Sequence, residues 1–280
     1  MNLRRTYTVL RTDLRQLRLA KDFWIPMAIL AALFFVVLPA VLLLALGAAE
    51  RIDLVRQIGD TIDLLPDTVK RQITDRVQGP QPSGLGRAQF AMAVYMFAPL
   101  AIVVPLTIST AIGANTIVGE REKATGEFLA HSPASEAEIY LGKLAASILP
   151  GYLATYVGFG IYAVLVNLIV GPKVGGWFFP TTEWWILMFW VVPPFIMLAI
   201  SVVLRISARV RSATASQQAS GLVTLPLILL SYAQSSGSLF GGARFGWIVG
   251  AIAWPLAILG LIRGSKAVTR ERLLGADVQA

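Results

Sequence analysis

The stretch GEREKATGE, residues 119–127, stands between two long apolar runs and decides how the chain folds. Residues 88–119 on one side and residues 144–172 on the other contain no Asp, Glu, Lys or Arg. A helix of about 20 apolar residues crosses a bilayer, so each run is long enough to span one. The charged stretch is therefore expected in water, as an ordered loop on one side of a membrane.

The composition places the chain among membrane proteins. Of its 280 residues, 56% are apolar and 14% are charged, whereas soluble domains carry about 25% charged residues. The chain contains no cysteine, which excludes disulfides, thiol catalysis and cysteine metal sites. The single histidine, His131, excludes any site that needs two, so we predict neither a metal centre nor a bound cofactor.

We also expect that the chain is not an enzyme. An intramembrane protease or lipid transferase needs a nucleophile and a base, or metal ligands, at the depth of the membrane. No Asp, Glu or Lys lies in the middle of an apolar run. The net charge of +8 comes from basic residues that flank those runs, which is typical of membrane topology and does not indicate nucleic-acid binding.

Six uncharged runs predict six transmembrane helices in a single domain, residues 1–280. The runs lie at Phe23–Leu46, Gln89–Ala111, Leu144–Val170, Trp184–Leu204, Ala213–Gln234 and Phe245–Ile262. All must be helical because lipid offers no partners for backbone N–H and C=O groups, so the predicted fold class is an all-α membrane protein. Most runs contain proline, whose missing N–H favours a kink and frees a carbonyl for a neighbouring helix to satisfy.

The distribution of Lys and Arg predicts the orientation of the chain in the cytoplasmic (inner) membrane. Sixteen basic residues lie on the side that holds the N-terminus, the loop 113–143 and the C-terminus, and eight lie on the other side. Six of those eight belong to the long loop 48–88, where charge has little influence on topology. Both termini and the charged loop are therefore expected in the cytoplasm, and the loop 48–88 outside.

Residues 1–21 predict an amphipathic helix at the membrane surface. Four leucines recur at helical spacing along one face, at Leu3, Leu10, Leu14 and Leu17. Arginines occupy the opposite face, at Arg4, Arg11, Arg15 and Arg18. This pattern is typical of an interfacial helix whose arginines meet anionic lipid headgroups. A basic flank without fixed structure is the alternative.

The external loop 48–88 predicts one or two further amphipathic helices. An apolar stripe begins at Ile52, and a second helix is expected to begin near Asp67, with Ile73 on its apolar side. These helices either cap the bundle or bind an external accessory protein.

The loop 113–143 predicts a helix, a turn and a second helix on the cytoplasmic surface. Ser135 precedes Glu138 by three residues, which forms a capping box and predicts a helix that begins near Ser135 and runs into the third span. Charges of both signs alternate in the first part of the loop. They suit a docking surface that must hold its register and exclude wrong partners, and the alternative is a solvated loop with ordinary surface charges.

The same loop resembles the cytoplasmic loop of the type 2 ABC exporter permeases. In that family a G-E-R-E-[KR]-G-T-x-E segment precedes a P-x-S-x-x-E-[IL]-x-x-G-K segment, and residues 119–127 and 133–143 are similar to them. The stretch Arg205–Pro226 also resembles the loop and fifth span of such permeases. Ala124 stands where glycine is common, and Gly126 replaces a usual leucine, which weakens that helix by about 1 kcal/mol.

The resemblance implies a membrane subunit that pairs with a second copy of itself and with two separate ABC ATPase subunits to export a substrate. The loop would be the coupling helix that contacts the ATPase, through Glu120, Arg121, Glu122, Lys123, Thr125, Glu127 and His131. ATP and Mg²⁺ would be bound by that partner, because the chain contains no G-x-x-x-x-G-K-[ST] phosphate loop.

Polar residues within two spans are candidates for lining a transport pathway. They are Thr107, Thr110 and Asn115 in the second span and Gln217, Ser220, Thr224 and Ser231 in the fifth. Polar groups in hydrocarbon often face a pathway or the interior of a bundle. Hydroxyl groups also serve as ordinary hydrogen-bonding contacts between helices, so both interpretations stay open.

Two alternative functions remain. A permease-like subunit that serves complex assembly or signalling would have the same features. A secondary carrier would show internal repeats and charges in the middle of its spans, and neither is found in the sequence. The absence of such charges favours transport driven by a partner over transport driven by an ion gradient.

Overall fold

The computed structural model describes residues 2–48, 60, 62, 67–77, 84–122, 126–210, 212, 214–216, 218–219, 221–222, 224–226, 229 and 243–266. Within these residues the regular structure is all-helical, as predicted. The α-helices are α1 (Leu3–Leu19), α2 (Lys21–Ala32), α3 (Leu38–Ala48), α5 (Asp67–Arg76), α6 (Gly84–Ala91), α7 (Leu100–Glu122), α8 (Gly126–Ala130), α9 (Glu136–Ile169), α10 (Gly171–Val174), α11 (Thr182–Ile186), α12 (Val192–Ser207) and α14 (Ala243–Ser265). Three π-helical segments are η1 (Leu33–Val37), η2 (Met92–Met96) and η3 (Leu187–Val191).

Five helical stretches among the described residues are long and apolar enough to cross a membrane. They are Trp24–Gly47, Leu85–Glu120, Glu136–Ile169, Thr182–Ser207 and Arg244–Ser265. These stretches coincide with five of the six predicted spans and confirm that those regions form long apolar helices. The remaining predicted span, Ala213–Gln234, lies outside the described residues for half of its length.

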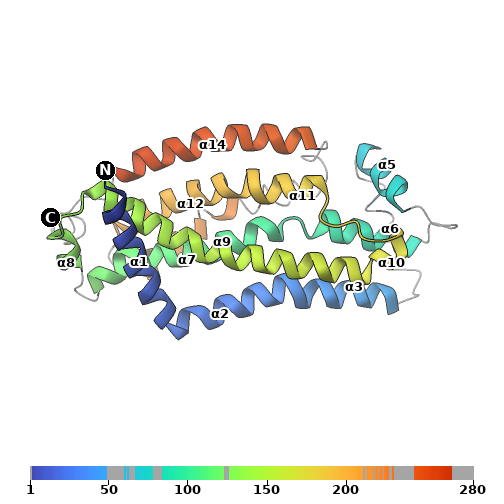
Figure 1. Ribbon diagram of the computed structural model, residues 1–280, viewed down its shortest axis with the longest axis horizontal. Coiled ribbons are helices and arrows are strands. Elements are labelled where there is room, and N and C mark those ends of the chain that lie inside the picture. Colours follow the sequence, from blue (N-terminus) through green and yellow to red (C-terminus); the bar gives the residue numbers. More distant parts are fainter. Residues whose placement is uncertain are drawn as a thin grey trace.

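The spanning helices lie side by side along the long axis of the molecule (Figure 1). α7 packs against both α9 and α12, and α12 also packs against α14, whereas α2 and α3 contact the other side of α9. α1 and α8 lie at one end of the bundle, and α5, α6 and α10 lie at the opposite end. The chain therefore presents two distinct ends, separated by the apolar helices.

The helix that was predicted to begin near Asp67 is present as α5. Its Ile73 and the following Val77 are buried, and α5 contacts α6 at the end of the bundle (Figure 1). The stripe that begins at Ile52 lies outside the described residues.

Proline explains where the helices widen into π-helical turns. Each π-helical segment ends two or three residues before a proline, namely Pro39, Pro99 and Pro193. Proline lacks the N–H that a carbonyl of the preceding turns would accept. In η3 the carbonyl of Met188 accepts from the hydroxyls of Tyr156 at 3.1 Å and Tyr152 at 3.4 Å. In η2 the carbonyl of Val94 accepts from the indole N–H of Trp184 at 2.8 Å. Side chains of other helical elements thus satisfy these carbonyls, as predicted.

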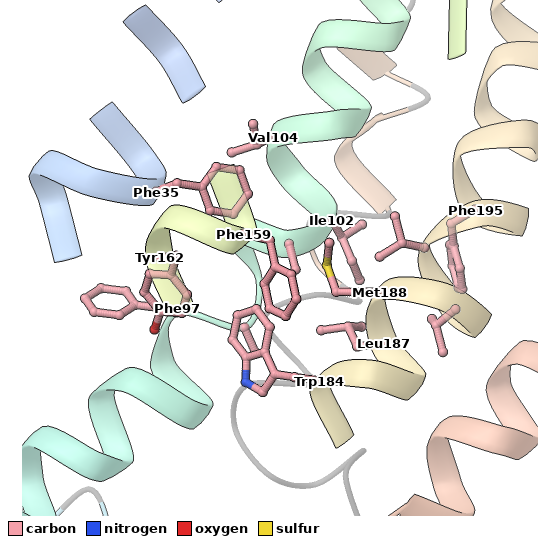
Figure 2. Packing of buried hydrophobic residues seen from close by; sticks show 14 of the residues in the cluster. Phe35, Phe97, Ile102, Val104, Phe159, Tyr162, Trp184, Leu187, Met188 and Phe195 are labelled. Carbon is pink, nitrogen blue, oxygen red and sulfur yellow. The ribbon is translucent and has the colours of Figure 1, made fainter. Parts of the chain in front are cut away.

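Aromatic side chains hold α9 against α11 and η2. Phe159 of α9 stacks on Trp184 of α11 with a centroid distance of 5.7 Å and an interplanar angle of 10°, as Figure 2 shows. Tyr162 meets Phe97 edge to face at 6.2 Å, and its hydroxyl donates to the carbonyl of Ala93 in η2. Because each ring buries a large apolar area and such pairs have preferred geometries, the cluster holds one end of the bundle in a single arrangement.

Candidate functional site

The charged loop forms a corner between α7 and α9, as predicted. α7 ends at Glu122, the short helix α8 follows, and α9 begins at Glu136. The predicted capping box is confirmed: the backbone N–H of Glu138 donates to Ser135 Oγ at 3.3 Å, and the backbone N–H of Ser135 donates to Glu138 Oε2 at 3.0 Å. We call α1, the last turn of α7, α8 and residues 131–143 the α8 corner.

α1 packs across the first turns of α9 at this corner. Gly142 permits the approach, because a Cβ atom at that position would lie 2.8 Å from Cβ of Val9. Arg5 Nη1 donates to the carbonyl of Pro133 at 2.7 Å. The backbone N–H of Asn2 donates to the carboxylate of Glu138. The N-terminal helix is therefore attached to the same residues that shape the loop.

The leucines of the predicted stripe on α1 differ in how far they are buried. Leu10, Leu14 and Leu17 are half-buried, and Leu17 packs against the core, whereas Leu3 is exposed. The four arginines predicted on the opposite face are all exposed. Part of the stripe thus contacts the protein, and the location of α1 at a membrane surface stays a prediction.

A buried ion-pair cluster joins three helices beneath the corner. Lys143 of α9 is fully buried, and its Nζ lies 2.7 Å from Glu120 Oε1 of α7 and 3.5 Å from Asp13 Oδ2 of α1. The same Nζ donates to the carbonyl of Thr116 at 3.2 Å. Burial raises the pKa of Asp13, and the charge and hydrogen bond of Lys143 oppose that rise. We call these three charged residues the Lys143 cluster.

The Lys143 cluster was not predicted from the sequence. Glu120 was predicted to contact an ATPase, and the structure pairs one of its oxygens with Lys143 inside the chain. The cluster left no local signal, because the partners of Lys143 lie 23 and 130 residues away in sequence. Only the motif match singled out Lys143, and it did not indicate a partner.

α8 presents an exposed aromatic side chain that the sequence analysis also missed. Phe128 is 81% exposed, although it lies in the middle of the loop. His131 is exposed as well, and its Nδ1 lies 2.9 Å from the carbonyl of Glu127. The available signal in the sequence was the apolar pair Phe128 and Leu129 in a loop that is otherwise rich in charged and small residues. Single exposed apolar side chains are common on protein surfaces, and aromatic side chains are frequent among the few residues that dominate a binding interface.

A cavity of about 490 Å³ lies between α1 and α8. Three of its lining residues carry charges, at Arg5, Asp13 and Glu120, and Phe128 lies at its edge on α8 together with Leu129. A hollow of mixed polarity beside an exposed aromatic ring can receive side chains of a partner. Among the described residues no three His, Asp or Glu are grouped to hold a metal ion.

The predicted coupling residues are distributed over the corner. Glu120 belongs to the Lys143 cluster, and Glu127 and His131 contact one another at α8. Arg121 and Glu122 end α7. Lys123 and Thr125 lie outside the described residues.

The predicted pathway residues of the second span bond to their own helix. The hydroxyl of Thr107 donates to Val103, that of Thr110 to Leu106, and the amide of Asn115 to Ala111, at 2.8, 2.8 and 3.2 Å. Thr224 of the fifth span is buried. Gln217, Ser220 and Ser231 lie outside the described residues. A pathway along these residues stays a prediction.

The fold defines a class of protein: the described residues form an all-helical bundle with five helices that are long and apolar enough to cross a membrane, as in a multi-pass membrane protein. A family model described as ABC-2 family transporter protein matches residues 54–249, which is more than half of the chain. The chain belongs to this family, and the resemblance seen in the charged loop is thereby confirmed. A search among curated proteins finds no match.

Membership fixes the general role of the chain. It is the permease subunit of an ABC transporter and functions with an ABC ATPase. This role accords with the expectation that the chain is not itself an enzyme, and it disfavours a secondary carrier.

Proposed function

We propose that this chain is the membrane subunit of an ATP-driven exporter, working as a homodimer with two ATPase subunits that bind ATP and Mg²⁺. The observation that carries the proposal is the α8 corner, where an exposed Phe128 lies beside a cavity whose lining includes Arg5, Asp13 and Glu120. The corner is tied to α1, α7 and α9 at once. Movement of a partner seated there would therefore be transmitted to two spanning helices.

The directions of the helices support six spans. A Cβ atom at Gly246 would lie 2.9 Å from Ile186, and one at Gly260 would lie 3.1 Å from Leu198. α14 thus runs parallel to the stretch from α11 to α12. Two parallel neighbours require a return crossing between them, and the predicted fifth span, Ala213–Gln234, would supply it. With six spans and the basic residues on the cytoplasmic side, the α8 corner faces the cytoplasm.

The proposed docking depends on Phe128 as an anchor. Interfaces derive most of their binding energy from a few side chains, and aromatic residues in the centre are the commonest of these. α8 has only five residues, and the Lys143 cluster and the capping box hold the helices on either side of it. A partner that covers Phe128 would meet a surface whose shape is already set.

A Phe128→Ala variant is expected to bind the ATPase about 30-fold more weakly, because truncating an anchor costs about 2 kcal/mol or more. Titration of the purified ATPase against the permease in detergent measures this directly, and substrate-stimulated ATP hydrolysis should fall with it. Trp177→Ala is the matched control, since Trp177 is 69% exposed near the opposite end of α9. Unchanged binding by the Phe128 variant would contradict docking at the α8 corner.

The orientation can be tested because the chain has no cysteine. A single cysteine at His131 and another at Trp177, in separate variants, provide one reporter at each end of the bundle. We expect a membrane-impermeant maleimide to label the Trp177→Cys variant in intact cells and the His131→Cys variant only after the membrane is opened. The reverse result would place the α8 corner outside and rule out cytoplasmic docking.

A further inference from the structure

A second, apolar groove of about 350 Å³ lies between α2 and α9, away from the α8 corner. Small residues line this space on both facing helices: Ala28, Ala31 and Ala32 on one side and Ala154 on the other. α2 therefore lies against α9 without filling the space between them. Both helices belong to stretches that are apolar enough to cross a membrane, so the groove borders on lipid.

The outer rim of the groove is open. Leu153 and Val157 of α9 line it and are 64% and 56% exposed. Large apolar side chains at a membrane-facing rim are stable in contact with acyl chains and unfavourable in contact with water. The groove is thus accessible from the side at which lipid is present.

One end of the groove carries a cation and a hydrogen-bond donor. Trp24 lines the groove, and Lys21 precedes it by three residues, one helical turn away on the same face of α2. Lys21 is exposed. The indole N–H of Trp24 is buried and has no acceptor in the part of the chain that the structure describes. The exposed Arg18, in the last turn of α1, adds a second cation close in sequence.

We propose that this groove binds one anionic phospholipid, with an acyl chain between α2 and α9 and the phosphate at Lys21 and Trp24. Lys21 and Trp24 at one end of the groove would face the phosphate of the lipid. The apolar part of the groove, between α2 and α9, would hold the acyl chain. Its volume lies within the range of about 300–1,000 Å³ that is typical of small-molecule sites. The site needs only that α2 and α9 cross the membrane, and it does not rest on ATPase docking.

A helix of a second copy is the other occupant to consider, and the dimensions disfavour it. A helix with its side chains is about 10 Å across, so a length of four turns would need on the order of 1,500 Å³. It could cover the exposed rim, but it would leave the slot between the small residues empty. An acyl chain is thin enough to enter the slot.

Native mass spectrometry of the full-length chain tests the proposal. The protein is delipidated in mild detergent and exposed to equal concentrations of phosphatidylglycerol and phosphatidylcholine. We expect one phosphatidylglycerol to remain per chain in preference to phosphatidylcholine. Ala154→Phe, which fills the slot, should abolish this retention. Lys21→Gln, an exposed change that leaves the fold intact, should lower retention about fivefold, because one surface charge near anionic lipid is lost.

Two matched variants control for general effects on lipid binding. Ala251→Phe adds the same ring to an exposed position of α14, and Lys266→Gln removes an exposed cation after the same helix; both should retain lipid as the unmodified chain does. Equal retention of the two lipids, or full retention by Ala154→Phe, would overturn the proposal. So would a loss of the dimer in Ala154→Phe with unchanged lipid retention, since that would assign the groove to a second copy.

Discussion

A Lys143→Met variant is expected to be destabilised by about 3–5 kcal/mol, the cost of breaking a buried ion pair by removing one partner. Lys143 is fully buried and is the cation that faces Glu120 and Asp13 in the Lys143 cluster. Without it, the two partly buried carboxylates lose the ammonium group that they share. Thermal unfolding in detergent should show a midpoint lower by about 10 °C.

The loss of stability in the Lys143→Met variant should become smaller as the pH falls. The pKa of Asp13 is already raised by burial, and removing Lys143 also removes the charge that opposes this rise. An acid whose pKa is raised in the folded state binds its proton more tightly there than in the unfolded chain. The variant should therefore gain stability relative to the unmodified protein as the pH drops through that raised pKa.

Two further variants decide whether the cluster is the cause. Lys70→Met removes a lysine whose partner, Asp67, lies 3.8 Å away and is 82% exposed, so it should cost less than about 1 kcal/mol. Combining Lys143→Met with Asp13→Leu and Glu120→Met removes all three charges and should restore most of the stability, because apolar replacements of buried ion pairs are often neutral. If Lys143→Met alone were as stable as the unmodified chain, the Lys143 cluster would not contribute to the stability of the fold.

Features with a local signal could be predicted from the sequence. Uncharged runs locate spans because a bilayer demands helices of a certain length, and five such stretches are found. The capping box at Ser135 needs only two residues three apart, and it begins α9 as predicted. The helix at Asp67 has the same kind of signal in its apolar spacing.

Features that depend on distant parts of the chain could not be predicted. The position of Asp13 against Lys143 results from α1 folding back across α9, and nothing near either residue indicates it. Glu120 looked like a surface charge because its neighbours are charged, yet its exposure depends on which face of α7 meets α9. The exposure of Phe128 was missed for the opposite reason, because an apolar residue gives no sign in the sequence that it will lie at the surface.

The second large effect is expected at Gly151, where α9 lies close to the backbone of α7. A Cβ atom there would lie 2.9 Å from the carbonyl oxygen of Pro105, besides overlapping the side chain of Ser109. A side chain can rotate away, but the backbone carbonyl of a packed helix cannot. A Gly151→Leu variant is therefore expected to force the two helices apart, at a cost of about 3 kcal/mol, the upper part of the range for overpacking.

Gly160→Leu is the control, because it lies on the same helix and a Cβ there meets nothing within 4 Å. Leucine forms helix better than glycine by about 0.8 kcal/mol or less, so the control should be as stable as the unmodified chain or slightly more so. Thermal unfolding in detergent compares the two variants. Adding Ser109→Gly to Gly151→Leu should recover only part of the loss, since that change removes the side chain and leaves the Pro105 carbonyl in place. Complete recovery would show that the backbones are not in contact, whereas equal stability of the two leucine variants would mean that α7 and α9 do not pack at Gly151.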